Sequence, residues 1–418
     1  MMLGILFGLF FLLLFIGMPV AYGMVISAVV TLFFDPSLTG IIIPQKLFTG
    51  MDSFSLMAVP FFMLAGTLME KSGITDILVN WAKSLVGHFK GGLGHATIVT
   101  GVVMAGVSGS ANADTSALAS ILVPIMRKDG YDDGYSCALV SSCGALGPVI
   151  PPSIMMVLYS GVTSIAIGKL FMAGIIPGLV IAIGYMIVNG IYARKASIPK
   201  SKFVGWKALG QDTLKALPAI IMPVIISGAT TATEAGVVAC VYSIIYGFIR
   251  KTMNTKHVWE CFKDAVHGTT NCMIVVVFAG IFGTLATNYN LSKVVLAASQ
   301  VFHGNPYLIL IFISIILYIA GMFIDSNAAM LMLVPIFTPL IAAYGFDPIY
   351  FAMVCILTLD MGGMSPPVGL LMYISASITD TPLEKVVRNI FKFITVNYSV
   401  TLLVIFIPAL VTWLPSLM

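Results

Sequence analysis

The amino-acid sequence predicts an all-α polytopic membrane protein built from two inverted-topology repeats, each with one re-entrant hairpin and one discontinuous helix. Three observations predict this fold class. The 418 residues are 59% hydrophobic and 9% charged, whereas about a quarter of the residues in soluble proteins are charged. Several apolar segments are interrupted by polar residues, glycine and proline, and motifs of the first half recur in the second half.

Composition also excludes several classes of function. The net charge of +4 is small and the basic residues are spread over short connecting segments, so nucleic-acid binding is not indicated. The sequence contains no P-loop motif for ATP, and its six cysteines form no CxxC pair. No basic residue precedes the apolar segment 1–15, so we expect it to be the first membrane span and not a cleaved signal peptide.

The first repeat is expected to cover residues 1–200. A membrane span needs about 20 residues, so the long apolar segment 3–34 is divided near Gly17 into two short crossings. Single spans are expected at 55–70 and 170–193. Together these segments form the predicted scaffold helices of the first repeat.

The same repeat contains two interrupted apolar segments. Residues 93–126 carry polar side chains at 108–116, which predicts a re-entrant hairpin with a polar tip. Non-helical backbone at membrane depth is tolerated only where protein buries it or where it faces a water-filled cavity, so a cavity is expected. Residues 135–158 contain a run of glycine and proline at 144–152, which predicts a broken helix.

The second repeat is expected to cover residues 201–418. Its scaffold helices occupy 217–249, divided near residues 228–231, and further spans lie at 270–287 and 393–415. A second hairpin at 306–343 and a second broken helix at 350–375 repeat the pattern of the first half.

Positively charged residues set the expected orientation. In this layout, five connecting segments on one side hold every Lys and Arg except Lys46, Lys169 and Lys293, and the positive-inside rule places that side in the cytoplasm. An odd number of crossings in each half gives the two halves opposite orientations. The five segments are 71–90, 127–128, 194–215, 250–263 and 385–392.

Three short amphipathic segments, 74–88, 203–215 and 257–265, are expected to lie in the membrane interface. Each carries Lys or Trp among apolar residues, which is typical of interfacial helices.

An internal repeat supports the inverted halves. The recurring residues are Asp114, Ala117, Leu122, Val123 and Pro124 in the first half and Asp325, Ala328, Leu333, Val334 and Pro335 in the second. With an assumed four-residue insertion, Gly147 and Pro151-Pro152 then match Gly362 and Pro366-Pro367. Inverted repeats with interrupted helices at corresponding positions indicate a binding site near the membrane midplane of a secondary transporter.

The interruptions carry the residues that could bind an ion and a solute. Oxygen-bearing side chains and the carbonyls released at glycine and proline breaks suit a small cation, while the start of the following helix directs its positive end at an anion. Helix capping by the first tip, capping by Asp325 and simple kinks at the breaks are the alternatives. The candidate sodium ligands are Ser110, Asn112, Asp114, Gly144, Gly147, Pro148, Asp325, Asn327, Gly362, Gly363 and Met364, and the candidate solute-binding residues are Ser108, Ser110, Asn112, Thr115, Ser153, Ser326, Asn327 and Ser365.

The number and the identity of the coupled ions stay open from these residues. One or two sodium ions, or a proton on Asp114, Asp325 or Asp360, all fit the pattern. An intramembrane enzyme would need paired catalytic groups, which the sequence does not contain, and a passive channel would not require hairpins at equivalent depth in inverted halves.

Several motifs together resemble one family over essentially the whole chain. They are Ser108-Gly109-Ser110, Gly130-Tyr131-Asp132, Ile150-Pro151-Pro152-Ser153, Gly168-Lys169-Leu170-Phe171, Ala173-Gly174-Ile175-Ile176-Pro177-Gly178, Thr233-Glu234-Ala235 and Pro366-Pro367-Val368-Gly369. With these motifs the chain resembles the large membrane subunit of tripartite ATP-independent periplasmic (TRAP) transporters.

The resemblance implies sodium-driven uptake of a carboxylated solute across the bacterial inner (cytoplasmic) membrane by an elevator motion. A periplasmic binding protein would deliver the solute, and a small membrane subunit on a separate chain would complete the transporter in the lipid bilayer. Na+ is the implied coupling ion, with no organic cofactor. The sequence looks most like the sialic-acid type, and a C4-dicarboxylate TRAP transporter or a proton-coupled organic anion transporter remain the alternatives.

Overall fold

The computed structural model describes residues 1–35, 40–53, 55–198, 200, 203–228 and 232–418. These residues form 21 α-helices and no β-strand, so the predicted all-α fold class is confirmed. The helices of the first half are α1 (Met2–Phe15), α2 (Val20–Phe33), α3 (Ile42–Thr49), α4 (Ala58–Lys71), α5 (Ile74–Val86), α6 (Gly92–Ser108), α7 (Ala111–Lys128), α8 (Asp133–Gly144), α9 (Ile154–Thr163) and α10 (Ile167–Lys195).

The second half contains the remaining eleven helices. They are α11 (Trp206–Gly228), α12 (Ala232–Ile249), α13 (Thr255–Asn288), α14 (Leu291–Ser299), α15 (Pro306–Phe323), α16 (Ser326–Phe337), α17 (Pro339–Tyr344), α18 (Pro348–Gly363), α19 (Leu370–Ile378), α20 (Leu383–Phe406) and α21 (Ala409–Thr412). The predicted division near residues 228–231 falls between α11 and α12, and residues 229–231 themselves lie outside the described residues.

The first apolar segment divides where glycine and proline predict. Gly17 has a φ of 91°, a conformation that glycine adopts without steric cost, and Pro19 immediately precedes the first residue of α2. Each of α1 and α2 has 14 residues and is therefore about 21 Å long. Both are shorter than the hydrocarbon core of about 30 Å. Within the described residues, four helices are long and apolar enough to cross a membrane, namely α10, α13, α15 and α20.

The first hairpin turns at Gly109 and Ser110, between α6 and α7. Gly109 has a φ of 62°, and a Cβ atom there would overlap the carbonyl oxygen of Pro152. The Ile154 N–H donates to the carbonyl of Gly109 at 3.3 Å. Glycine at this position therefore lets the hairpin tip contact the gap in the first discontinuous helix.

The second hairpin turns at Asp325, between α15 and α16. The Asp325 carboxylate caps α16 by accepting two backbone N–H groups of the first turn at 3.1 and 3.3 Å. The second arm of the hairpin predicted at 306–343 consists of two helices, α16 and α17. Thr338 separates α16 from α17, and the next residue, Pro339, has no N–H to continue the helical hydrogen bonding.

Two helices are discontinuous at the predicted positions. Residues 145–153 separate α8 from α9, and residues 364–369 separate α18 from α19. Each gap contains a Pro-Pro pair with a cis peptide bond, Pro151–Pro152 and Pro366–Pro367.

The helix boundaries correct the pairing of the two hairpins. Ser110 and Asp325 are the N-cap residues of α7 and α16 and are 215 positions apart, the same separation as between the N-cap residues Asp132 and Asp347 of α8 and α18. Asp114 lies one turn inside α7, so pairing it with Asp325 shifts the hairpin by one helical turn. The assumed four-residue insertion is not needed.

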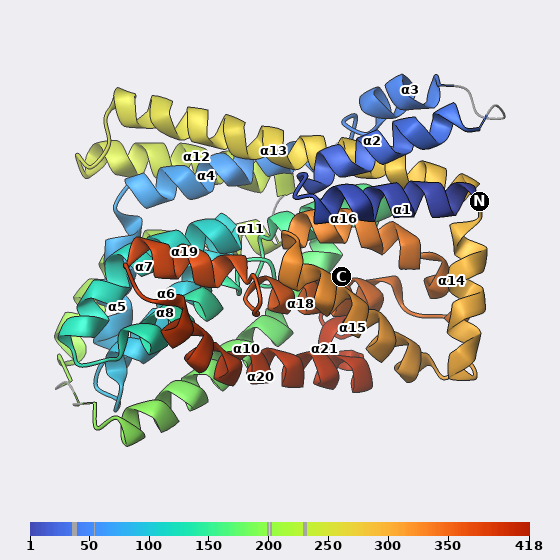
Figure 1. Cartoon of the computed structure of the whole chain (residues 1–418). Helices are drawn as coiled ribbons and strands as arrows, with labels where there is room; N and C mark the ends of the chain where they lie inside the picture. Colours follow the sequence, from blue (N-terminus) through green and yellow to red (C-terminus); the bar gives the residue numbers. More distant parts are fainter. Residues whose placement is uncertain (36–39, 54, 199, 201–202, 229–231) are drawn as a thin grey trace.

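The helices form two layers (Figure 1). Helices α1, α2, α3, α4, α12 and α13 lie along the top of the view, and the hairpins, α10, α18 and α20 lie below them. In the upper layer α4 packs against α12 and α13, and in the lower layer α8 packs against α20. Both layers therefore combine helices from the two sequence halves, and the repeats are intertwined.

The basic connections gather at one end of the molecule. The connections α7–α8, α12–α13 and α19–α20 and the C-terminal end of α10 lie at the left end in Figure 1, whereas the amino terminus and α14 lie at the right end. These connections belong to the basic segments 127–128, 194–215, 250–263 and 385–392. Their common position is the arrangement that the positive-inside rule requires.

Two of the three predicted interfacial segments are parts of longer helices. Residues 206–215 begin the 23-residue helix α11, and residues 257–265 lie in the first part of the 34-residue helix α13. Only residues 74–88 largely correspond to a separate amphipathic helix, α5. The apolar stretch that follows each of these two segments continues the same helix, and the interfacial position of all three segments stays a prediction.

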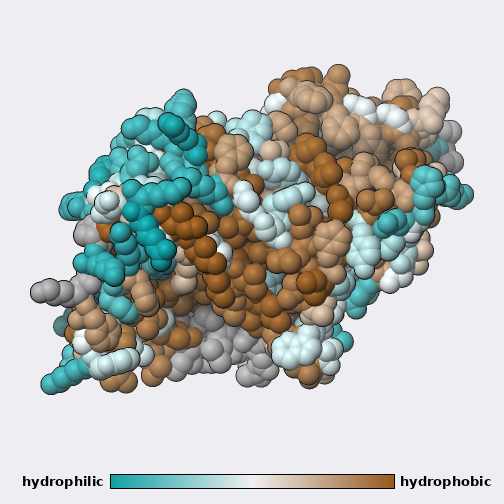
Figure 2. Space-filling view, turned by 90° about the horizontal axis from the view of Figure 1, so that it is seen from below, coloured by the Kyte–Doolittle hydropathy of each residue, from teal (hydrophilic) through white to brown (hydrophobic). Residues whose placement is uncertain are grey.

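The outer surface carries a broad hydrophobic area. Figure 2 shows the molecule from below, with hydrophobic residues across the middle and hydrophilic residues gathered at the left. On α10 the exposed fractions are 48% for Leu179, 57% for Ile183, 59% for Ile187 and 50% for Ile191. An exposed apolar face of this kind fits contact with lipid chains and not with water.

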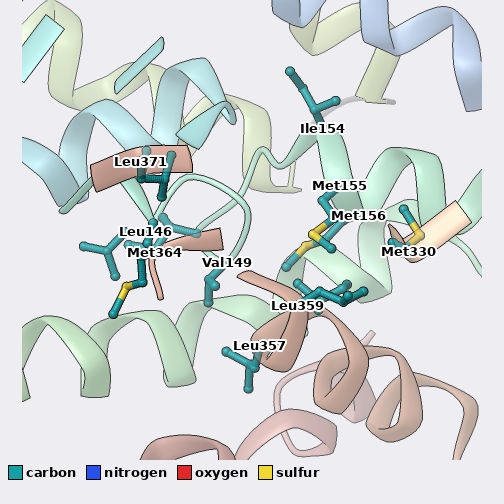
Figure 3. Packing of buried hydrophobic residues seen from close by; sticks show 14 of the residues in the cluster. Leu146, Val149, Ile154, Met155, Met156, Met330, Leu357, Leu359, Met364 and Leu371 are labelled. Carbon is teal, nitrogen blue, oxygen red and sulfur yellow. The ribbon is translucent and has the colours of Figure 1, made fainter. Parts of the chain in front are cut away.

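Apolar side chains of both halves meet between the two gaps (Figure 3). The structure buries these side chains almost completely, with exposed fractions of 3% or less. Close packing here joins the two discontinuous helices into one body. The residues include Leu146, Val149 and Met156 from the first half and Leu359, Met364 and Leu371 from the second half.

Replacing Tyr185 with Phe is expected to lower the free energy of unfolding by about 1–3 kcal/mol. The buried Tyr185 hydroxyl on α10 donates to Asn397 Oδ1 on α20 at 2.8 Å. Without the hydroxyl this amide oxygen loses its donor in the protein interior. Denaturation of the purified chain in detergent measures the change, and Tyr398→Phe, at a side chain 44% exposed, is the control expected to show none. Equal midpoints for Tyr185→Phe and the natural protein would contradict the expectation.

Candidate functional site

A cavity of about 510 Å³ lies between the two hairpin tips. Residues 109–112 of the first tip and residues 324–328 of the second tip line it. Pro148 and Gly363 contribute from the two discontinuous helices, and Asn271 contributes from α13 on the upper layer. Segments that are far apart in the sequence thus assemble one central site.

Seven of the predicted site residues share this cavity. Both tips present polar side chains to it, at the starts of α7 and α16. The positive ends of these two helices therefore point at the same space. The seven residues are Ser110, Asn112, Pro148, Asp325, Ser326, Asn327 and Gly363.

The cavity contains acidic groups and no basic side chain among its described lining residues. Asp325 is exposed to it, and Asp360 lines it while keeping only 3% of its surface accessible. Two carboxylates that line one cavity oppose the binding of an anion there. An anionic solute therefore requires an additional cation or proton in or beside the cavity.

Behind the first tip lies a second group of predicted residues, which does not line the cavity. Asp114 and Thr115 are fully buried, and the Ser108 hydroxyl donates to Asp114 Oδ1 at 2.6 Å. Asp114 Oδ2 and Thr115 Oγ1 have no hydrogen-bond partner among the described residues. Gly144 and Gly147 pack directly against them, since a Cβ atom would overlap Thr115 Oγ1 in one case and lie 3.2 Å from Asp114 Oδ2 in the other.

These buried oxygens fit a small cation. A carboxylate oxygen buried without a partner is costly, and a cation bound to it would remove that cost. The donor set consists of oxygens, which hard cations prefer, and the small residues leave no side chain in the way. Asp114 and Thr115 are the described groups best placed to hold such an ion, and Ser108 orients the carboxylate.

Two serines that were predicted to bind solute have other partners. Ser153 donates to the carbonyl of Pro148 at 2.6 Å and caps α9, and Ser365 donates to the carbonyl of Met361 at 2.7 Å. Neither serine lines the cavity. Both hydroxyls complete backbone hydrogen bonding at the gaps, which is a common use of serine at helix ends.

Two predicted ligands of the second gap also lie away from the cavity. Gly362 is in close backbone contact with Gly321 on α15, since a Cβ atom on Gly362 would lie 2.7 Å from that backbone. The fully buried Met364 directs its sulfur at Asn397 Nδ2, at 3.5 Å. The carbonyl of Gly144, the last residue of α8, accepts the N–H of Gly147 at 2.9 Å. The carbonyl of Gly362 likewise accepts the N–H of Ser365 at 2.9 Å, so both of these carbonyls have backbone donors.

Asp360 and Asn271 are two polar lining residues that are absent from the predicted ligand sets. Asp360 is named in the sequence analysis only as a possible proton carrier. An acidic residue in an apolar helix, close to two glycines, is a sequence signal that indicates a residue of the binding site. Asn271 lies in the long helix α13 and lines the cavity from the opposite layer. The position of Asn271 at the cavity follows only from how the two layers pack against each other.

Comparison with known proteins identifies the family. Residues 7–410 match the family described as Tripartite ATP-independent periplasmic transporter, DctM component. The sialic acid TRAP transporter large permease protein SiaM of Vibrio cholerae is 35% identical over 412 residues, covering 97% of this chain and 96% of that protein. The 2,3-diketo-L-gulonate TRAP transporter large permease protein YiaN of Escherichia coli is 33% identical over 402 residues and 95% of each chain.

A solved structure shares the fold. The Alcanivorax borkumensis YdaH transporter aligns with a TM-score of 0.64 over 86% of each chain, at 13% sequence identity. At this identity the likeness concerns the fold alone, which is that of a helical membrane transporter. The chain therefore belongs to the DctM component family of tripartite ATP-independent periplasmic transporters and is a multi-pass membrane permease, not an enzyme.

Proposed function

We propose that this chain couples the uptake of a carboxylated solute, with sialic acid as the first candidate, to sodium ions by alternating access. The observation that carries the proposal is the cavity between the two hairpin tips. It combines two helix starts, which favour an anion, with Asp325 and Asp360, which oppose one. A bound cation reconciles these features and makes solute binding depend on the ion.

The buried pair behind the first tip supports sodium as that cation. Asp114 Oδ2 and Thr115 Oγ1 offer oxygens without other partners, and the Asp114 carboxylate supplies the negative charge. Ion binding there would fix the start of α7, which carries Ser110 and Asn112 into the cavity. Occupancy of the ion site would thus prepare the surface that the solute contacts.

The two layers support an elevator motion. The hairpin tips belong to the lower layer, whereas Asn271 and Tyr22 reach the cavity from the upper layer. Movement of the lower layer along the upper one would carry the cavity from one side of the membrane to the other without breaking the packing between the two gaps. The closely packed contact of α16 with α13 is where such sliding would occur.

Family membership implies a small membrane subunit and a periplasmic binding protein as partners. We place the complex in the bacterial inner membrane, with the basic end in the cytoplasm. Sialic acid is proposed because the SiaM relative is named for it, and 2,3-diketo-L-gulonate, for which YiaN is named, is the second candidate. Both solutes carry a carboxylate that the two helix starts can accept.

Uptake of labelled sialic acid into proteoliposomes tests the proposal. The vesicles contain this chain and its small partner, with the binding protein outside and with or without an inward sodium gradient. We expect uptake that requires both the gradient and the binding protein. Uptake that depends on a proton gradient and not on sodium would overturn the ion assignment. Sodium-dependent uptake of 2,3-diketo-L-gulonate but not of sialic acid would overturn the solute assignment.

A further inference from the structure

A second cavity, of about 320 Å³, lies at the basic end of the molecule. It is formed between α10 and the α5–α6 connection, and it shares no lining residue with the cavity between the tips. Three of its seven lining residues carry basic side chains and none is acidic. The lining residues are Val86, Phe89, Lys90, His95, Met186, Gly190 and Arg194.

The basic groups of this cavity have no acidic partner. Among the described residues, the ion pairs join Arg127 to Asp133 and Lys215 to Asp212, and neither includes Lys90 or Arg194. A further basic residue, Lys200, pairs its backbone with that of Lys90. Lys90 and Arg194 therefore have no ion-pair partner among the described residues and are available to an anion from outside the chain.

The walls of the cavity are held together by hydrogen bonds. Asn189 Nδ2 on α10 donates to the carbonyl of Gly91 at 3.0 Å, and the N–H of Gly94 donates to the Tyr131 hydroxyl at 3.1 Å. A Cβ atom on Gly91 would overlap the side chain of Ala193. This close contact places the α5–α6 connection directly against α10, so the cavity exists before any ligand enters.

The exposed apolar face of α10 continues from the cavity along the same helix. Leu179, Ile183, Ile187 and Ile191 recur at intervals of one helical turn and are each about half exposed. Their exposure fits contact with lipid chains. Figure 2 shows a hydrophobic area across the middle of the molecule, with hydrophilic residues gathered at the left. A molecule with a charged head in the cavity could therefore rest its chains on α10.

We propose that this cavity binds the phosphate group of an anionic phospholipid. The Arg194 guanidinium can contact two phosphate oxygens and the Lys90 ammonium adds a point charge. Basic cavities between membrane helices recognise anionic headgroups in this way, and the apolar face of α10 accepts the acyl chains. The four isoleucine and leucine side chains favour a lipid over a soluble phosphate compound.

Lipid titration of the complete membrane complex tests this assignment. The complex is placed in phosphatidylcholine nanodiscs, and phosphatidylglycerol binding is measured by native mass spectrometry and by the melting temperature. Replacing Lys90 and Arg194 together by Gln is expected to weaken phosphatidylglycerol binding about 30-fold, since each basic residue near an anionic lipid contributes roughly fivefold. Arg250→Gln with Lys251→Gln, a basic pair in the α12–α13 connection, is the matched control expected to change binding less than about twofold.

Two outcomes would overturn the proposal. Equal weakening by the two double variants would show that total charge at this end, and not the cavity, attracts the lipid. Inorganic phosphate alone could raise the melting temperature as much as phosphatidylglycerol does. If the Lys90 and Arg194 variant lost that rise, the cavity would be assigned to a soluble phosphate. Retention of phosphatidylglycerol by the control but not by the cavity variant supports the lipid site even if the cavity variant is less stable.

Discussion

Asp114→Asn is expected to raise the sodium concentration for half-maximal uptake roughly 30- to 100-fold, corresponding to about 2–3 kcal/mol of lost ion binding. The substitution keeps the size of the side chain and an oxygen for the Ser108 hydroxyl. It removes the negative charge at Oδ2, the buried oxygen that has no partner among the described residues. The expected effect is large because a neutral amide does not offset the free-energy cost of removing a cation from water.

Two measurements separate ion binding from transport in this variant. Sodium-dependent uptake reports the whole cycle, and sodium-dependent thermal stabilisation of the purified complex reports binding even when uptake is lost. Asp347→Asn is the matched control, because Asp347 caps α18 with hydrogen bonds of 2.8 and 2.9 Å that asparagine can also accept. An unchanged sodium dependence of both measurements in Asp114→Asn would remove Asp114 from the ion site.

The elements of the fold could be predicted from the sequence because their signals are local. Polar residues inside apolar segments marked the tips of both hairpins, and Gly-Pro runs marked both gaps. The alignment of the first half with the second half, which pairs Asp114 with Asp325, is wrong by one helical turn at the hairpins. Matching of residue identities cannot distinguish alignments that differ by one turn when both place apolar residues on the same helix face, and only the N-cap positions of Ser110 and Asp325 decide between them.

The sequence predicts the site residues at the two hairpin tips, but it does not predict all of the residues that line the cavity. Ser153 and Ser365 carry the same hydroxyl as Ser110, yet their partners are nearby backbone carbonyls, a choice that depends on local backbone geometry. Asn271 enters the cavity from a helix of the other layer, about which the sequence spacing carries no information. Asp114 was predicted correctly as a buried acid in the first hairpin, and the structure adds that it lies behind the tip and not in the cavity.

Gly362→Ala is expected to destabilise the protein by roughly 1–3 kcal/mol or more and to abolish uptake. A Cβ atom on Gly362 would lie 2.7 Å from the backbone of Gly321 and 2.8 Å from the carbonyl oxygen of Tyr318. These backbone atoms are held in the last turns of α15 and cannot move aside independently of the helix, so α15 and α18 would have to separate. The second hairpin tip would move with them, because the Ser326 hydroxyl donates to the carbonyl of Leu359 on α18 at 3.1 Å.

The neighbouring glycine gives a matched control for this prediction. A Cβ atom on Gly363 would approach only the Ser326 hydroxyl oxygen, at 2.8 Å, which can rotate away at the cost of its one hydrogen bond to the carbonyl of Leu359. Gly363→Ala should therefore retain most of its stability in denaturation of the purified chain, and uptake should fall less than in Gly362→Ala. Alanine keeps the carbonyl of residue 362, so a Gly362→Ala protein with natural stability and altered sodium affinity would favour the ligand role predicted from the sequence. Loss of stability with unchanged sodium affinity would instead establish that Gly362 serves the contact between α15 and α18.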